Sequence, residues 1–127
     1  MKRARAQIAV LDDEEPVRRA LERLLRSAGV GVDTFASGAE FFSRLSSLDL
    51  DCLILDLHMA GLNGFEVQAR LKELNIALPV IVITGHDTPE ARARAEAGGA
   101  SAYLLKPVDE KALLSAISAA MASRTNP

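Results

Sequence analysis

Five polar residues suited to phosphoryl chemistry stand at the ends of short apolar runs. Asp12 and Asp13 follow one run, Asp56 lies at the end of another, and Thr84 and Lys106 close two more. Carboxylates that lie close together raise one another's pKa unless a cation neutralises them, and Mg²⁺ prefers such oxygen ligands. A lysine ammonium and a threonine hydroxyl are suited to contacting phosphoryl oxygens. If the fold brings these residues together, they predict a site for a divalent cation and a phosphoryl group.

The acidic pair alone has a plainer explanation. Acidic side chains are favoured at the N-terminus of a helix, where they meet the positive end of the helix dipole. For Asp12 and Asp13 by themselves, this explanation and a cation site are equally well supported. The other three polar residues each end an expected strand, and together with the pair they favour the cation and phosphoryl site.

Short apolar runs and helical spacing alternate along the chain and indicate the elements that position these residues. A continuous apolar run too short for a helix is typical of a strand buried on both faces. Between the runs, apolar residues at spacings of three and four predict helices, with capping signals at Ser37, Thr88 and Asp109. The expected strands cover residues 8–11, 31–36, 52–57, 80–83 and 102–105.

This alternation predicts an α/β fold, a doubly wound parallel sheet of five strands with five helices on its two faces. In the commoner five-strand order, 2-1-3-4-5, the first and third strands are neighbours, and ligands bind beyond the carboxyl ends of the strands. The five polar residues then converge on one edge of the sheet. We expect one domain over residues 7–122, with flexible tails at 1–6 and 123–127.

Composition excludes several other classes. The chain has 127 residues, is 49% hydrophobic and carries a net charge of −2, which indicates a folded domain and argues against nucleic-acid binding through bulk charge. No apolar run approaches the roughly 18 residues that span a bilayer, and no apolar stretch of a secretory signal follows the basic start. The single cysteine, Cys52, excludes an internal disulfide. We expect a cytoplasmic protein that binds neither membrane nor nucleic acid.

Four motifs in order along the chain resemble those of one family. They are the acidic pair after the first strand, Asp56-Leu-His-Met59 followed by Gly64, Val82-Ile83-Thr84, and Tyr103-Leu-Leu-Lys106-Pro107. Each motif is weak alone, but their combination resembles the receiver domains of bacterial two-component response regulators, from Ile8 to about Met121. The resemblance implies a flavodoxin-like receiver fold.

For the site, the resemblance implies a phosphoacceptor and a metal. Asp56 would accept a phosphoryl group from phosphohistidine on a sensor kinase. Asp13, Asp56 and the backbone carbonyl of His58 would ligate Mg²⁺, and Asp12 would act through a bound water. Mn²⁺ is a second candidate ion.

The resemblance also implies a switch. Lys106 would pair with the acceptor carboxylate and then with a phosphoryl oxygen, and Thr84 would move toward the phosphoryl group on activation. Tyr103 matches the aromatic residue whose inward or outward position follows that movement. The Lys106–Pro107 peptide bond is similar to one that is cis in the family, and the sequence alone leaves its state open.

The function implied is phosphorelay signalling rather than enzymatic turnover, with the domain promoting its own phosphorylation and slow dephosphorylation. The expected partners are a sensor histidine kinase or a phosphotransfer protein, and a downstream target or an output domain beyond this chain. Whether the chain is a stand-alone regulator or the receiver of a longer protein stays open, as does a phosphorylation-dependent dimer. We expect no direct nucleic-acid binding by this chain.

Two alternatives are retained. A phosphatase of the haloacid dehalogenase type also uses an aspartate nucleophile and Mg²⁺, but it needs a second aspartate where this chain has His58, and usually a cap domain. A phosphorylation-independent interaction module of the same fold would have no use for an intact acidic, threonine and lysine set.

Four further residues have open roles. His58 and His86 each lie two positions after a site residue, and one hypothesis is that protonation of their imidazoles near pH 6–7 tunes hydrolysis of the aspartyl phosphate. The alternative is two exposed loop histidines with no kinetic role. Arg92 and Arg94 fit either a solvated helix face or a partner-binding surface.

Overall fold

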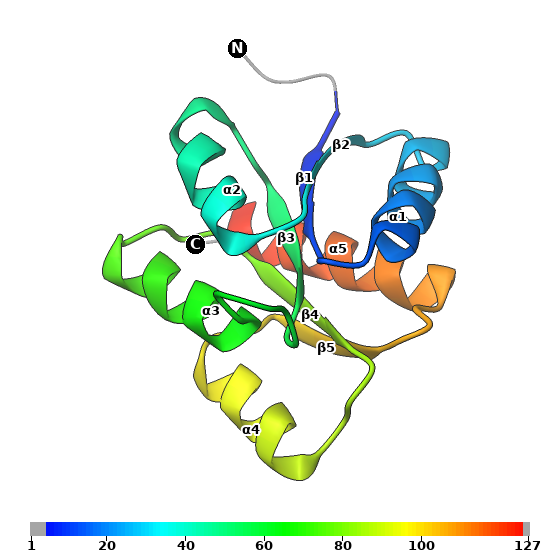
Figure 1. Cartoon of the computed structure of the whole chain (residues 1–127). Coiled ribbons are helices and arrows are strands. Elements are labelled where there is room, and N and C mark those ends of the chain that lie inside the picture. Colours follow the sequence, from blue (N-terminus) through cyan, green and yellow to red (C-terminus); the bar gives the residue numbers. More distant parts are fainter. Residues whose placement is uncertain (1–4, 126–127) are drawn as a thin grey trace.

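The computed structural model describes residues 5–125 and confirms the alternation of strands and helices (Figure 1). In chain order the elements are β1 Gln7–Leu11, α1 Glu15–Ser27, β2 Gly31–Phe35, α2 Gly38–Arg44, the short 3₁₀ turn η1 Leu45–Ser47, β3 Cys52–Asp56, α3 Gly64–Glu73, β4 Val80–Thr84, α4 Pro89–Ala97, β5 Ala102–Leu105 and α5 Glu110–Thr125.

The five strands form one parallel sheet in the order β2-β1-β3-β4-β5, as predicted. Figure 1 shows α1 and α5 on one face of the sheet and α2, α3 and α4 on the other. The fold is therefore the doubly wound arrangement that the sequence predicts, with β1 and β3 side by side at the point where the strand order reverses.

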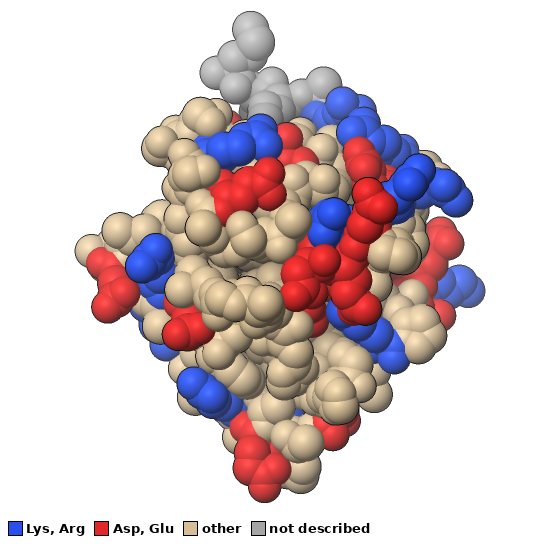
Figure 2. Space-filling model, in the orientation of Figure 1, with Lys and Arg blue, Asp and Glu red and all other residues tan. Residues whose placement is uncertain are grey.

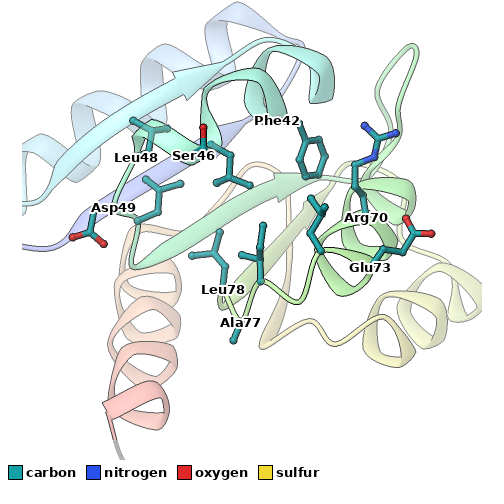
Figure 3. A pocket seen from close by; sticks show the side chains of 12 residues that line it. Phe42, Ser46, Leu48, Asp49, Arg70, Glu73, Ala77 and Leu78 are labelled. Atoms are coloured by element: carbon teal, nitrogen blue, oxygen red, sulfur yellow. The ribbon is translucent and has the colours of Figure 1, made fainter.

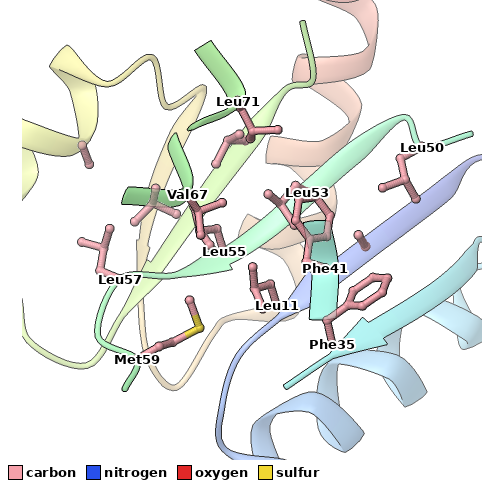
Figure 4. Packing of buried hydrophobic residues seen from close by; sticks show 14 residues of the cluster. Leu11, Phe35, Phe41, Leu50, Leu53, Leu55, Leu57, Met59, Val67 and Leu71 are labelled. Carbon is pink, nitrogen blue, oxygen red and sulfur yellow. The ribbon is translucent and has the colours of Figure 1, made fainter. Parts of the chain in front are cut away.

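Two hydrophobic clusters fill the two faces of the sheet. The cluster under α1 and α5 includes Leu25 and Leu113, and the other includes Phe41 of α2 and Val67 of α3. In the second cluster, the rings of Phe41 and Phe35 meet edge to face with centroids 5.4 Å apart (Figure 4). Because both faces of the strands are covered, the strands read as continuous apolar runs rather than alternating ones.

The predicted helix caps form, with one difference. Thr88 and Asp109 each accept a hydrogen bond from the backbone N–H three residues on, at 3.0 and 2.9 Å. Ser37 likewise accepts from the N–H of Glu40 at 3.1 Å. A serine followed three residues later by glutamate predicts a capping box, but the Glu40 carboxylate accepts from the N–H of Ala36 rather than from that of Ser37. Only half of that capping box is therefore formed.

The C-terminal helix is longer than the sequence predicts. It continues through Thr125, so residues 123–125, expected as the start of a flexible tail, are helical. Alanine-rich sequence favours helix, and no glycine or proline interrupts this stretch. Of the rest of the expected tails, residues 1–4 and 126–127 lie outside the described residues. Among the residues described, no helix has the length and apolar character needed to cross a membrane.

Candidate functional site

The register of the sheet brings the predicted site residues to one edge. Leu11 of β1 pairs with Leu55 of β3, so the residues that follow them, Asp12 and Asp56, lie at the same level on neighbouring strands. The ends of β4 and β5 continue this edge, and the backbone N–H of Lys106 donates to the Thr84 carbonyl at 2.8 Å. The fold therefore positions all five predicted residues at the carboxyl ends of adjacent strands.

Three carboxylates meet at this edge. Oxygens of Asp12, Asp13 and Asp56 lie within 4.8 Å of one another. Asp12 is fully buried and Asp56 is 2% exposed, whereas Asp13 is exposed. Figure 2 shows acidic side chains gathered over the carboxyl end of β1 and the start of α1. The site is therefore an acidic cluster that reaches solvent through Asp13.

The ammonium group of Lys106 lies among the carboxylates. Its Nζ is 2.8 Å from an oxygen of Asp12, 3.3 Å from one of Asp56 and 3.1 Å from one of Glu14. The contact with Asp12 is an ion pair without the alignment of a hydrogen bond, because that oxygen has no hydrogen-bond partner among the described residues. Sequence reasoning missed Glu14, because no spacing rule places its side chain against Lys106.

Burial and charge shift the pKa values of the two central groups. Burial, and then the negative charge of Asp12, raise the pKa of Asp56 to about 6, while Lys106 acts in the opposite direction. For Lys106, burial lowers the pKa, but the carboxylates of Asp12, Glu14 and Asp56 outweigh burial and hold it above its usual value. Lys106 therefore stays protonated, and it lies beside the Asp56 carboxylate, whose negative charge is disfavoured by burial and by Asp12.

Backbone contacts fix the loops that carry the acids. Asp13 accepts a hydrogen bond from the N–H of Ala60 at 3.2 Å, which links the loop after β1 to the loop after β3. The start of α3 also packs closely on β3. A Cβ on Gly64 would lie 2.6 Å from the carbonyl oxygen of Asp56, so only glycine fits there.

A capping box at the start of α3 escaped sequence reasoning. Asn63 accepts from the N–H of Glu66 at 2.9 Å, and the Glu66 carboxylate accepts from the N–H of Asn63 at 2.8 Å. An Asn followed three residues later by Glu is the sequence signature of this motif, so the signal was present. The box fixes the end of the loop that leads from Asp56 to α3.

Thr84 is buried, and its hydroxyl is turned toward its own loop. It accepts from the backbone N–H of His86 at 3.0 Å and donates to the carbonyl of the same residue at 3.2 Å. The imidazoles of His86 and His58 meet edge to face with ring centroids 5.6 Å apart. The two histidines therefore lie together beside the acidic cluster.

Tyr103 is half-buried beneath α4. Its hydroxyl oxygen is buried and has no hydrogen-bond partner within residues 5–125, and Arg92 lies over the ring at 4.4 Å from its centroid. Burial, and then the nearby Asp87 carboxylate, raise the pKa of the phenol above its usual value.

The peptide bond between Lys106 and Pro107, whose state the sequence left open, is cis.

The residues present fit a divalent cation. The donor set consists of carboxylate oxygens, the ligands that Mg²⁺ prefers, and Mn²⁺ accepts the same ligands. Asp13 is exposed, which leaves the acidic cluster accessible to an ion, and the raised pKa of Asp56 marks negative charge that a cation would stabilise. The chemistry of this donor set therefore suits a divalent cation.

A groove on the described surface lies away from this site. It has a volume of about 730 Å³ and runs between the C-terminal ends of α2 and α3, with Phe42, Arg70 and Leu78 among its lining residues (Figure 3). None of the predicted site residues lines it, and its walls are mainly apolar. We assign the site from the chemistry at the strand ends and not from the size of this groove.

The fold and the site define a doubly wound α/β domain with a cluster of carboxylates and a lysine at its topological switch point. The family model of the response regulator receiver domain matches residues 8–118. The chain belongs to this receiver family, and the resemblance drawn from its motifs is confirmed. Because the chain belongs to the receiver family, the alternative of a haloacid dehalogenase-type phosphatase is set aside.

Relatives support the same assignment. Response regulator protein TodT of Pseudomonas putida is 40% identical over 114 residues, which are 90% of this chain and 50% of that protein. Nodulation protein W of Bradyrhizobium diazoefficiens is 39% identical over 116 residues, or 91% of this chain and 51% of that protein. This chain thus spans about half the length of these curated relatives.

Solved structures agree on the fold. The crystal structure of a response regulator receiver protein from Burkholderia phymatum is 45% identical, with a TM-score of 0.83 over 93% of this chain and 96% of that chain. The structure of FixJ-N is 31% identical, with a TM-score of 0.86 over 95% of each chain.

Proposed function

We propose that this chain accepts a phosphoryl group on Asp56 from a phosphohistidine of a sensor kinase or phosphotransfer protein. The observation that carries the proposal is the Asp56 carboxylate itself. It is 2% exposed at a strand end, 3.3 Å from Lys106, and within 4.8 Å of two further carboxylates. Membership of the receiver family supports the same role.

The reaction is a single displacement at phosphorus. A carboxylate oxygen of Asp56 forms the new P–O bond as the P–N bond to the donor imidazole breaks, and the departing nitrogen takes up a proton. A pKa of about 6 keeps Asp56 mostly ionised at neutral pH, as a nucleophile must be. Lys106 pairs with the carboxylate before transfer and with a phosphoryl oxygen afterwards. Such transfers depend on positioning and charge neutralisation more than on covalent machinery.

A bound Mg²⁺ would neutralise charge on the phosphoryl oxygens during the transfer. Asp13, Asp56 and the backbone carbonyl of His58 would hold the ion directly, and Asp12 would act through a water. Mn²⁺ would use the same ligands. The fully buried position of Asp12, already paired with Lys106, supports this indirect role.

Phosphorylation would then act as a switch. Thr84 would give up its contacts with His86 to bind the phosphoryl group, and Tyr103 would change position with it. The altered surface would bind a downstream target, an output domain of a longer protein, or a second copy of this chain. The relatives named above are about twice as long as this chain, which supports an output domain beyond it. We further propose a cytoplasmic location and no direct binding of nucleic acid by this domain.

His58 and His86 would tune the lifetime of the aspartyl phosphate by restricting the approach of water. The ring centroids of His58 and His86 lie 5.6 Å apart beside the acidic cluster, which supports this role. Dephosphorylation of His58→Ala and His86→Ala, followed across pH, tests it. We expect altered rates, whereas rates equal to wild type at every pH would show that the two histidines have no kinetic role.

Mass measurement after incubation with a phosphoryl donor and Mg²⁺ tests the proposed function. We expect the wild-type chain to gain one phosphate, from acetyl phosphate or from a phosphorylated kinase, and Asp56→Asn to gain none. Omission of Mg²⁺ should prevent the gain in the wild type. Equal labelling of the two proteins would contradict the assignment of Asp56. An interaction module that works without phosphorylation would show no labelling with either donor.

A further inference from the structure

The chain has two histidines, and both lie beside the acidic cluster although they are far apart in sequence. His58 follows β3 and His86 follows β4, each two residues after the end of its strand. Their ring centroids are 5.6 Å apart, with the ring planes at 84° to each other. Both residues are exposed. Two neighbouring loops therefore present a pair of imidazoles to solvent.

The backbone of each histidine is held close to its strand. The N–H of His58 donates to the Asp56 carboxylate at 3.5 Å, and the N–H of His86 donates to the Thr84 hydroxyl at 3.0 Å. The strands β3 and β4 are hydrogen-bonded neighbours in the sheet. The fold therefore brings the two imidazoles together before a ligand arrives, which lowers the ordering cost of binding.

The spacing of the rings suits coordination of one metal ion. Metal–nitrogen bonds of ~2.1 Å place the centroids of two coordinated imidazoles about 5.2–5.6 Å apart when the angle at the ion is about 110–120°. The centroids of His58 and His86 already lie at 5.6 Å. Because the rings meet edge to face, one ring must rotate about its Cβ–Cγ bond before both direct a nitrogen at the same point. That rotation leaves the centroid almost in place, and the exposed side chains have room for it.

The chemistry of this pair differs from that of the acidic cluster. Mg²⁺ prefers oxygen ligands, whereas neutral imidazole suits borderline ions such as Zn²⁺ and Cu²⁺. The nearby carboxylates attract any cation to this edge of the sheet, and the imidazoles then select the borderline ion. Cys52, the one cysteine of the chain, is fully buried in β3 and cannot reach an ion at these exposed loops.

We propose that His58 and His86 form a binding site for one Zn²⁺ or Cu²⁺ ion, separate from the oxygen ligands of the acidic cluster. One nitrogen of each imidazole binds the ion, and water completes its coordination. The bound ion ties the loop after β3 to the loop after β4 beside Asp56, and so restricts the approach of a phosphoryl donor. This restriction rests on the proposed function, whereas binding of the ion does not.

Copper allows the coordinated imidazoles to be counted. One equivalent of Cu²⁺ is added to the full chain in excess Mg²⁺, which occupies the oxygen ligands, and pulsed EPR then detects the remote nitrogen of each coordinated ring. We expect two imidazoles on one ion in wild type, one in His58→Ala or His86→Ala, and none in the double variant. Cys52→Ala, the matched control without the thiol, should give the wild-type spectrum.

Zinc affinity is measured by titration calorimetry, again in excess Mg²⁺. We expect each single histidine variant to weaken Zn²⁺ binding by at least about ten-fold, a loss that removal of a supporting contact of a metal ligand already causes. Because both histidines are exposed on loops, the variants should keep the wild-type circular dichroism spectrum. If an alanine variant fails to fold, His58→Gln and His86→Gln are judged by the same criteria.

One imidazole or none on copper in wild type would overturn the site, as would equal Zn²⁺ affinity of wild type and the double variant. Two imidazoles in a single variant would mean that copies of the chain share the ion, and would also overturn it.

A second arm follows labelling by acetyl phosphate in excess Mg²⁺, with and without Zn²⁺. At ten times its Kd the ion occupies about nine-tenths of the chains, so labelling of wild type should slow by up to about ten-fold. Zn²⁺ should leave the rate of the double variant unchanged. Absence of slowing in wild type, or equal slowing in both proteins, would overturn the restriction. Absence of labelling without Zn²⁺ would count against the proposed function, while the copper and zinc measurements still decide the site.

Discussion

At the scale of single residues, the ionised carboxylate of Asp56 lowers the free energy of unfolding, although it is the form that the proposed transfer requires. Burial and the neighbouring Asp12 raise its pKa to about 6, above the ~3.9 of an aspartate in an unfolded chain. Between these two values the folded state binds more protons than the unfolded state, so stability falls as the pH rises through this window. In the absence of a cation, Asp56 therefore lowers stability at neutral pH.

We expect Asp56→Asn to raise the free energy of unfolding by about 1–3 kcal/mol at pH 7 without Mg²⁺. The lower end allows for the lost ion pair with Lys106. The gain should shrink as the pH falls toward 4, where the wild-type carboxyl is protonated in the folded state. Urea unfolding at several pH values measures the difference, with Glu73→Gln, an exposed acid far from the site, as the control. A gain that did not depend on pH would contradict this explanation.

Asp13 has a different role because it is the exposed member of the acidic set. If it ligates Mg²⁺, the ion should stabilise the folded wild-type chain, by about 1.4 kcal/mol at ten times its Kd. In Asp13→Asn this stabilisation should become much smaller at the same concentration. Thermal unfolding with and without Mg²⁺ measures it, and equal stabilisation of the variant and the wild type would exclude Asp13 as a ligand.

At the scale of elements, the start of α3 determines where the loop after Asp56 ends. The reciprocal hydrogen bonds of Asn63 and Glu66 close the first turn of this helix, and Gly64 lets the turn approach the backbone of β3. The helix cap is therefore part of the support of the site, although it contributes no group to the chemistry.

Asn63→Ala should lower the free energy of unfolding by about 1 kcal/mol, the usual cost of losing an N-cap side chain. Asn63→Asp should keep most of the stability, because a carboxylate accepts the same hydrogen bond from Glu66. Chemical denaturation of the two variants measures this difference. Equal destabilisation by alanine and aspartate would show that the cap hydrogen bond is not responsible.

At the scale of the whole molecule, the sequence was sufficient for the fold and for the positions of the acids. Each strand is an apolar run that ends where a polar residue begins, and parallel strands place these ends on one edge, so Asp12, Asp56 and Thr84 follow from pattern alone. Of the partners of Lys106, Asp56 was expected from the family resemblance, whereas Glu14 was not. Its contact with Glu14 depends on how two side chains from distant parts of the chain turn toward each other, which no spacing rule gives.

Helix α4 shows the same limit more clearly. Its alternating alanines and arginines have no apolar period, so the sequence left Arg92 and Arg94 between a solvated face and a binding surface. In the structure both arginines cover aromatic rings of neighbouring elements. Cation–π contacts of this kind depend on how the helix packs against a neighbouring strand and helix, which the sequence of α4 alone does not contain.

The most direct test of the central claim identifies the residue that carries the phosphoryl group. After phosphorylation in the presence of Mg²⁺, borohydride reduces an acyl phosphate to an alcohol, so a phosphorylated aspartate becomes homoserine. Peptide mass mapping then locates the change. The account predicts homoserine at position 56 and at no other aspartate. Homoserine at Asp12 or Asp13, or its formation in Asp56→Asn, would contradict it.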